Sequence, residues 1–63
     1  MIIISRFGPT ADGLYIYNLD NVPQNGYVKV GNIFASTDRK ALNRIKRISG
    51  DPSLTFTIEE RQK

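Results

Sequence analysis

The fold is decided by residues 36–52, STDRKALNRIKRISGDP, where the apolar residues follow a helical period. Ser36 or Thr37 can cap a helix whose first turn contains Asp38. Gly50 can take the left-handed conformation that ends a helix, and the proline two residues later prevents the helix from continuing. We therefore predict a helix between these two signals.

The predicted helix has one apolar face and one basic face. At about 100° per residue the apolar positions share one arc, and they are Ala41, Leu42, Ile45 and Ile48. The opposite half carries Arg39, Lys40, Arg44, Lys46 and Arg47. These are five of the nine basic residues of a chain with a net charge of +3, and Asp38 is their single acidic neighbour. Such a cluster is typical of a phosphate-binding surface, although a solvated helix face has the same pattern.

Strands are predicted before and after the helix in the sequence. Residues 2–5 form a short apolar run, and residues 14–18 and 27–30 alternate between two kinds of side chain. Residues 54–60 alternate again after the helix. Turn residues separate the runs, and the short connection that ends in Asn25-Gly26 favours an antiparallel pair of the second and third strands.

These elements predict an α+β fold, in which a three- to four-stranded, mainly antiparallel sheet packs one helix on one face. We expect a single domain over residues 1–63, and a chain this short buries only about 60 % of its unfolded surface. The predicted core consists of Leu14, Ile16, Val28, Val30, Leu42, Ile45, Ile48, Leu54, Phe56 and Ile58.

One helix covers one face of such a sheet and leaves the other face open. Because successive strand residues point to opposite faces, we expect the open face to carry Tyr15, Tyr17, Tyr27, Lys29, Thr55 and Thr57. Aromatic rings beside a cation suit stacking on nucleic-acid bases, at roughly 1–3 kcal/mol per stacked base. The alternatives are cross-strand pairs between ordinary strand tyrosines, loops folded over the rings, or contact with a second copy of the chain or another protein.

The residue inventory argues against catalysis and metal binding. The chain has neither histidine nor cysteine, so the Ser–His–Asp arrangement is impossible and the usual ligands of structural zinc are missing. The six carboxylates are scattered, and Glu59 and Glu60 would point to opposite faces of a strand. We expect no enzyme activity, no cofactor and no metal. Short apolar runs and the lack of disulfides predict a cytoplasmic protein without a membrane span.

Three short matches resemble the opening half of the GIY-YIG endonuclease superfamily. They are Gly13-Leu14-Tyr15, Lys29-Val30-Gly31 and Arg44-Ile45-Lys46-Arg47-Ile48, and the second has the lysine–aliphatic–glycine form of the phage-associated branch. The resemblance spans residues 13–58 and implies active-site roles for Tyr15 and Arg44. The later helix of that family, with its metal-binding glutamate, has no counterpart here, so we expect no cleavage. The predicted architecture is also similar to the arm-binding domains of phage-type integrases, which insert a sheet into the DNA major groove.

The sequence thus predicts a small basic nucleic-acid-binding protein of phage or mobile-element type, with DNA favoured over RNA. The predicted binding residues are Tyr15, Tyr17, Tyr27, Lys29, Arg39, Lys40, Arg44 and Arg47. The alternative is a protein-binding module or inhibitor that docks on a host enzyme through its open sheet face or an edge strand, or a homodimer. A helix behind the sheet would turn its basic face away from the tyrosines, which separates the two binding surfaces.

Overall fold

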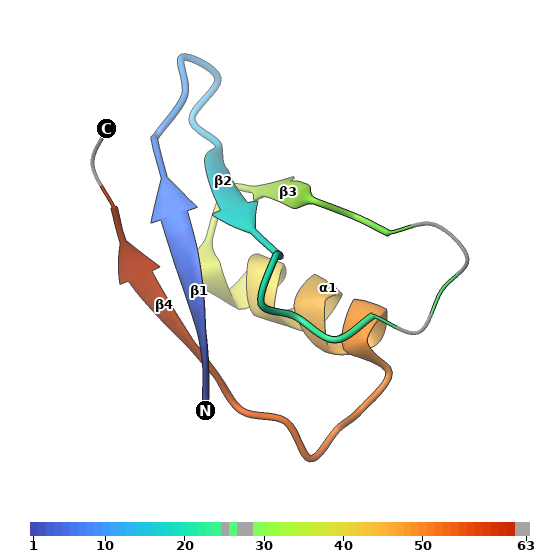
Figure 1. The fold of residues 1–63 in the computed structure, drawn as a ribbon. Coiled ribbons are helices and arrows are strands. Elements are labelled where there is room, and N and C mark those ends of the chain that lie inside the picture. The colour runs from blue at the N-terminus through green and yellow to red at the C-terminus, as the bar shows by residue number, and fades with distance from the viewer. Residues whose placement is uncertain (25, 27–28, 62–63) are drawn as a thin grey trace.

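The computed structural model describes residues 1–24, 26 and 29–61. These residues contain four strands and one helix, which are joined by loops (Figure 1). The elements are β1 (Ile2–Phe7), β2 (Tyr15–Asn18), β3 (Asn32–Ala35), α1 (Asp38–Ser49) and β4 (Phe56–Glu60). The strands form a single sheet and α1 packs on it, chiefly against β3. The predicted α+β class is confirmed.

The sheet has the order β3-β2-β1-β4. β1 pairs antiparallel with β2, and β2 pairs antiparallel with β3, whereas β4 runs parallel to β1. A parallel neighbour requires a long crossover, and the chain makes this crossover through α1. The sheet is therefore mixed but mostly antiparallel, and β3 and β4 are its two edge strands.

The strand register places the core between the sheet and α1. Tyr17 lies opposite Arg6 on one side and Ile33 on the other, so these three side chains share the face that α1 covers. The buried apolar residues among those described are Ile4, Tyr17, Leu19, Val22, Ile33, Ala35, Ala41 and Ile45. Partly buried residues that pack against them are Ile2, Tyr15, Val30, Ile48, Phe56 and Ile58.

The predicted orientation of β2 is wrong. Tyr17 is 0 % exposed within the core, whereas Ile16 lies on the opposite face and is half-buried. Alternation alone identifies two faces without saying which is inside, and choosing the other face inverts every side chain of the strand. Here the tyrosine ring supplies the larger apolar area, and its hydroxyl finds an acceptor, Asp38 Oδ1, at 2.7 Å.

The third strand also lies further along the chain than predicted. The range 27–30 was expected to form it, but β3 is Asn32–Ala35. The Gln24 side chain takes the place of a strand neighbour for Val30, because its Nε2 donates to the Val30 carbonyl and its Oε1 accepts from the Val30 amide, both at 2.7 Å. Val28 of the predicted core lies outside the described residues. Of the other predicted core residues only Ile45 is fully buried, and Leu14, Ile16, Val30, Leu42, Ile48, Leu54, Phe56 and Ile58 are half-buried.

The predicted helix is confirmed at both ends. Thr37 is the N-cap and its hydroxyl accepts a hydrogen bond from the Lys40 amide at 3.3 Å. Gly50 has φ +68° and its amide donates to the Lys46 carbonyl at 3.1 Å. Phe56 and Ile58 of β4 also face the core as predicted. In the described ranges there is no helix long and apolar enough to cross a membrane.

Candidate functional site

The exposed side of α1 carries a continuous row of positive charge. We define the basic helix face as Arg39, Lys40, Arg44, Lys46 and Arg47, all of which are exposed. They lie opposite the buried residues of α1, so core packing on one side of the helix turns these side chains to solvent on the other. The side chains of Arg39, Lys46 and Arg47 make no hydrogen bond or ion pair with any described residue. Their charges are free to meet an external anion.

Two residues of the basic helix face have partners within the protein. Lys40 Nζ donates to Ser36 Oγ at 3.3 Å, and Arg44 Nη1 donates to the Phe34 carbonyl at 2.7 Å. That carbonyl is on the outer edge of β3, so Arg44 covers part of this sheet edge. A guanidinium has five N–H donors in all, which leaves Arg44 able to meet a second acceptor.

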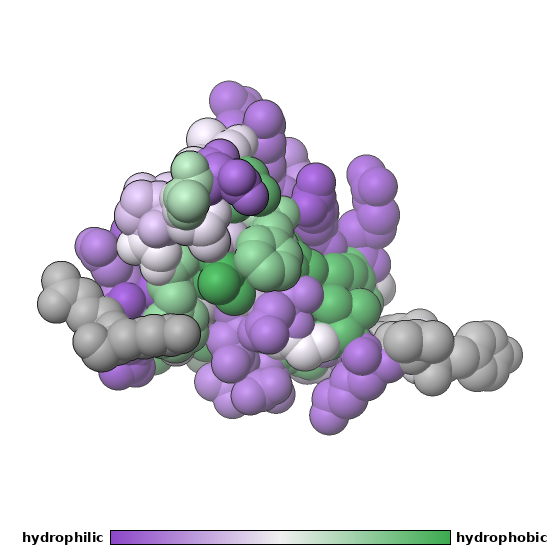
Figure 2. All heavy atoms as spheres, turned by 90° about the horizontal axis from the view of Figure 1, so that it is seen from above, coloured by the Kyte–Doolittle hydropathy of each residue, from purple (hydrophilic) through white to green (hydrophobic). Residues whose placement is uncertain are grey.

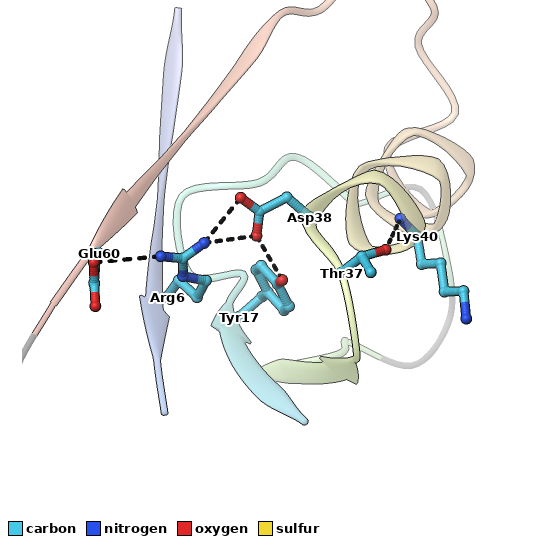
Figure 3. Close-up of polar contacts among 6 residues, drawn as sticks. All are labelled: Arg6, Tyr17, Thr37, Asp38, Lys40 and Glu60. Carbon is cyan, nitrogen blue, oxygen red and sulfur yellow. Dashed lines mark hydrogen bonds and ion pairs between the residues drawn. The ribbon is translucent and has the colours of Figure 1, made fainter. Parts of the chain in front are cut away.

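The one acidic residue of α1 is turned away from the basic helix face (Figure 3). Arg6 Nη1 donates to both carboxylate oxygens of Asp38 at 2.9 Å, and the Tyr17 hydroxyl donates to Asp38 Oδ1 at 2.7 Å. Arg6 Nη2 also lies 3.5 Å from Glu60 Oε2, and its guanidinium carbon is 4.7 Å from the centre of the Tyr15 ring. We call these five residues the Arg6 cluster.

Burial and hydrogen bonding within the Arg6 cluster shift the pKa values of Asp38 and Tyr17 in opposite directions. Burial opposes the ionised form of Asp38, but hydrogen bonds from Tyr17 and Arg6 and the charge of Arg6 outweigh it, and the pKa of Asp38 is lowered. Burial, together with the hydrogen bond to Asp38, raises the pKa of Tyr17. Asp38 is therefore a carboxylate bonded to a guanidinium, and it joins the first turn of α1 to β1 and β2.

Sequence reasoning missed the Arg6 cluster, because Arg6 and Asp38 are separated by 32 residues and meet only in the folded sheet. The only local signal is an acidic residue in the first turn of a helix, which is common for any helix. No group of three acidic side chains comes together as a metal site would need, as far as the structure describes the chain.

The predicted stacking surface is not formed by the described tyrosines. Tyr17 is fully buried, so the prediction that its ring lies on the open sheet face is wrong. Tyr15 is half-buried on the same face, beneath the Arg6 guanidinium. Tyr27 lies outside the described residues, and Lys29 is exposed in the loop before β3. No hydrogen bond, ion pair or ring contact between described residues joins Tyr15 or Tyr17 to the basic helix face.

Apolar side chains occupy the sheet face that α1 leaves open. Phe7 lies opposite Ile16, and Ile16 lies opposite Phe34, so these residues form a row across three strands. Phe34 is 49 % exposed, and beside Phe7 and Ile16 there is a hollow of about 420 Å³ that Pro9 and Arg61 also line. Figure 2 shows apolar side chains at the surface among hydrophilic ones. We call Phe7, Ile16 and Phe34 the open-face row. The sequence did not predict it, because Ile16 was expected in the core.

The two residues to which the GIY-YIG resemblance assigns active-site roles have different partners in the structure. Tyr15 contacts Arg6, whereas Arg44 bonds the Phe34 carbonyl. Lys29-Val30-Gly31 precedes β3 and is not part of a strand. The resemblance stays a prediction. Comparison with known proteins yields no match, since no protein-family model, no curated protein and no solved structure is significantly similar to this chain.

Proposed function

We propose that the protein binds nucleic acid through the basic helix face and has no catalytic role. One observation carries this proposal: five cationic side chains are exposed along one side of α1, and the single carboxylate of the helix is bonded to Arg6 and Tyr17. A phosphate backbone therefore meets positive charge that no acidic residue of the same helix offsets. Each phosphate contact releases condensed counterions, which makes such binding favourable and salt-dependent.

Duplex DNA is the ligand that the shape of this site favours. An α-helix is about 10–12 Å in diameter, and the major groove of B-DNA is about 12 Å wide. The major groove of A-form RNA is too narrow for side chains to enter. A convex helix face with outward arginine and lysine side chains is thus better matched to DNA than to double-stranded RNA.

Within the face, different residues have different parts in binding. The side chains of Arg39, Lys46 and Arg47 bond no described residue, so we assign to them the phosphate contacts. Arg44 is anchored on the Phe34 carbonyl and contributes charge at the border of the face. Asn43 lies among them on the exposed side, and its amide is the group best suited to an adenine edge.

A charge-matched pair of variants tests the proposal. The helix variant replaces Arg39, Lys46 and Arg47 with glutamine, and the control variant replaces three of the four cations outside the helix, Lys29, Arg61 and Lys63, with glutamine. Both changes take the net charge from +3 to zero. We expect the helix variant to reduce the slope of log K against log salt by about 0.9 per lost phosphate contact, with a much smaller change in the control.

The result is read from titrations of a labelled DNA duplex at several salt concentrations. Equal losses in both variants would show that net charge alone attracts DNA, and an unchanged slope in the helix variant would remove α1 from the site. Circular dichroism of each variant confirms that the helix is retained.

A protein-binding role is the second candidate, and the open-face row favours it. A contiguous row of partly exposed aromatic and aliphatic side chains is typical of a protein interface. Phe34 is exposed, and Phe7 and Ile16 are half-buried beside it. If the wild-type protein fails to bind duplex or single-stranded nucleic acid even at low salt, this candidate replaces the first.

A further inference from the structure

The two edges of the sheet differ in whether a side chain bonds the backbone groups that point away from the sheet. At the β3 edge the outward carbonyl of Phe34 is already bonded to Arg44. At the β4 edge the Arg61 amide bonds the Arg6 carbonyl and the Ile2 amide bonds the Thr55 carbonyl. Odd-numbered residues there thus bond β1, and Phe56, Ile58 and Glu60 direct their N–H and C=O groups outward. Arg44 thus covers part of the β3 edge, whereas no described strand or helix covers the β4 edge.

The side chains at the open edge are incompletely covered as well. Phe56 and Ile58 face the core side of the sheet but are only half-buried. The helix packs chiefly against β3, at the far side of the sheet from β4 (Figure 1). Among the described elements none lies beyond β4. A strand added at this edge would satisfy the backbone groups and cover apolar surface in the same step.

We propose that β4 pairs antiparallel with β4 of a second copy of the chain, about a two-fold axis at Ile58. Ile58 then faces its own counterpart, and Phe56 faces the partner's Glu60. Three outward residues on each strand, each with one N–H and one C=O group, form six hydrogen bonds between the copies. The two sheets join into one continuous sheet, as in other cases of strand addition at an exposed edge.

Charge selects this register among the antiparallel alternatives. With Ile58 on the axis, Glu59 faces the partner's Thr57, so no like charges lie directly opposite each other. Moving the axis to Glu59 or to Glu60 would place two identical carboxylates face to face, which destabilises a strand pair. Moving it to Thr57 leaves Glu60 beyond the paired segment and removes hydrogen bonds. The sequence of β4 therefore complements itself in one register.

The dimer would also arrange the two basic helix faces, and this consequence rests on the proposed function. A two-fold axis perpendicular to the sheet keeps both helices on the same side. At about 4.8 Å per strand, the five to seven strand spacings between the two helices amount to roughly 24–34 Å. Paired DNA-reading helices enter successive major grooves about 34 Å apart. One side of the dimer could therefore contact one duplex with both helices.

Amide hydrogen exchange tests the pairing without any substitution. We expect the amides of Phe56, Ile58 and Glu60 to become protected as protein concentration rises, because their partner is another copy. The amides of Thr57 and Glu59 bond β1 and should be protected at every concentration. Sedimentation equilibrium over the same range should show the 7.1 kDa chain doubling in mass.

A pair of variants at one position provides a second readout. Glu60→Pro removes an N–H group that faces outward, so the fold of the single chain tolerates it while the dimer loses one hydrogen bond at each end. Glu60→Gln is the matched control, since it changes the side chain but keeps the amide. We expect dimerisation to weaken about tenfold in Glu60→Pro relative to Glu60→Gln.

Three results would overturn the proposal. They are a monomer at millimolar concentration, a dimer whose new protection lies at Asn32 and Phe34 of β3, and a dimer that leaves every edge amide unprotected and buries the open-face row. All of these are measured without nucleic acid, so failure of the dimer and failure of DNA binding are distinguishable.

Discussion

Replacing Tyr17 by phenylalanine isolates the hydrogen bond that joins β2 to the start of α1. The ring of Tyr17 is 0 % exposed and packs in the core, and phenylalanine keeps this packing without opening a cavity. The lost group is the hydroxyl, which donates to Asp38 Oδ1 at 2.7 Å. The substitution therefore tests one bond.

The expected cost follows from the environment of the two partners. A hydrogen bond to a charged acceptor contributes about 1.5–3 kcal/mol. The Asp38 side chain is 43 % exposed and keeps Arg6 as a partner, so the lower end of this range applies. We expect a loss of about 1.5 kcal/mol in the free energy of unfolding, and at about 4–8 °C per kcal/mol this lowers Tm by roughly 6–12 °C.

Urea and thermal unfolding followed by circular dichroism measure this loss. Tyr15→Phe is the matched control, because the Tyr15 hydroxyl makes no hydrogen bond with a described residue. A double-mutant cycle of Tyr17→Phe with Asp38→Ala should give a coupling energy of about 1 kcal/mol or more. A cost below about 0.5 kcal/mol in Tyr17→Phe, equal to that of the control, would refute the assignment.

Two further predictions concern acid stability and the β3 edge. The pKa of Asp38 is lowered in the folded state, so its stabilising effect is present above the ordinary aspartate pKa of about 3.9 and is lost as pH falls through the folded value. Urea midpoints of the wild type should thus decline below about pH 4 more steeply than those of Asp38→Asn, and parallel declines would contradict this. Arg44→Ala should lose about 0.5–1.5 kcal/mol and associate through β3 at high concentration in sedimentation runs, because the Phe34 carbonyl is uncovered. The Arg47 side chain bonds no other described residue, so Arg47→Ala should stay within about 0.5 kcal/mol of the wild type and remain unassociated through β3. Equal behaviour of these two variants would rule out the edge-covering role.

The helix could be predicted from the sequence because all of its determinants are local. Thr37 caps it, Gly50 ends it, and the spacing of Ala41 and Ile45 sets its buried side. The basic helix face follows directly from that spacing. Its exposure in the structure agrees with the prediction, since no other described element covers this side of α1.

The sheet could be predicted in class but not in detail, because its determinants are distant in sequence. Whether Tyr17 or Ile16 faces inward depends on Asp38, which lies 21 residues away and accepts the tyrosine hydroxyl. The start of β3 depends on Gln24, whose side chain satisfies the backbone of Val30 in place of a strand. Both errors led to the prediction of a tyrosine surface on the open sheet face, where the structure has the open-face row.

The most direct test of the central claim is a ¹⁵N-resolved NMR titration of the protein with a short DNA duplex at low salt. We expect the perturbed amides to lie in α1, around Arg39, Asn43 and Arg47, and we expect the shifts to reverse when salt is added. Shifts confined to the open-face row around Phe34, or no shifts at all, would contradict this expectation.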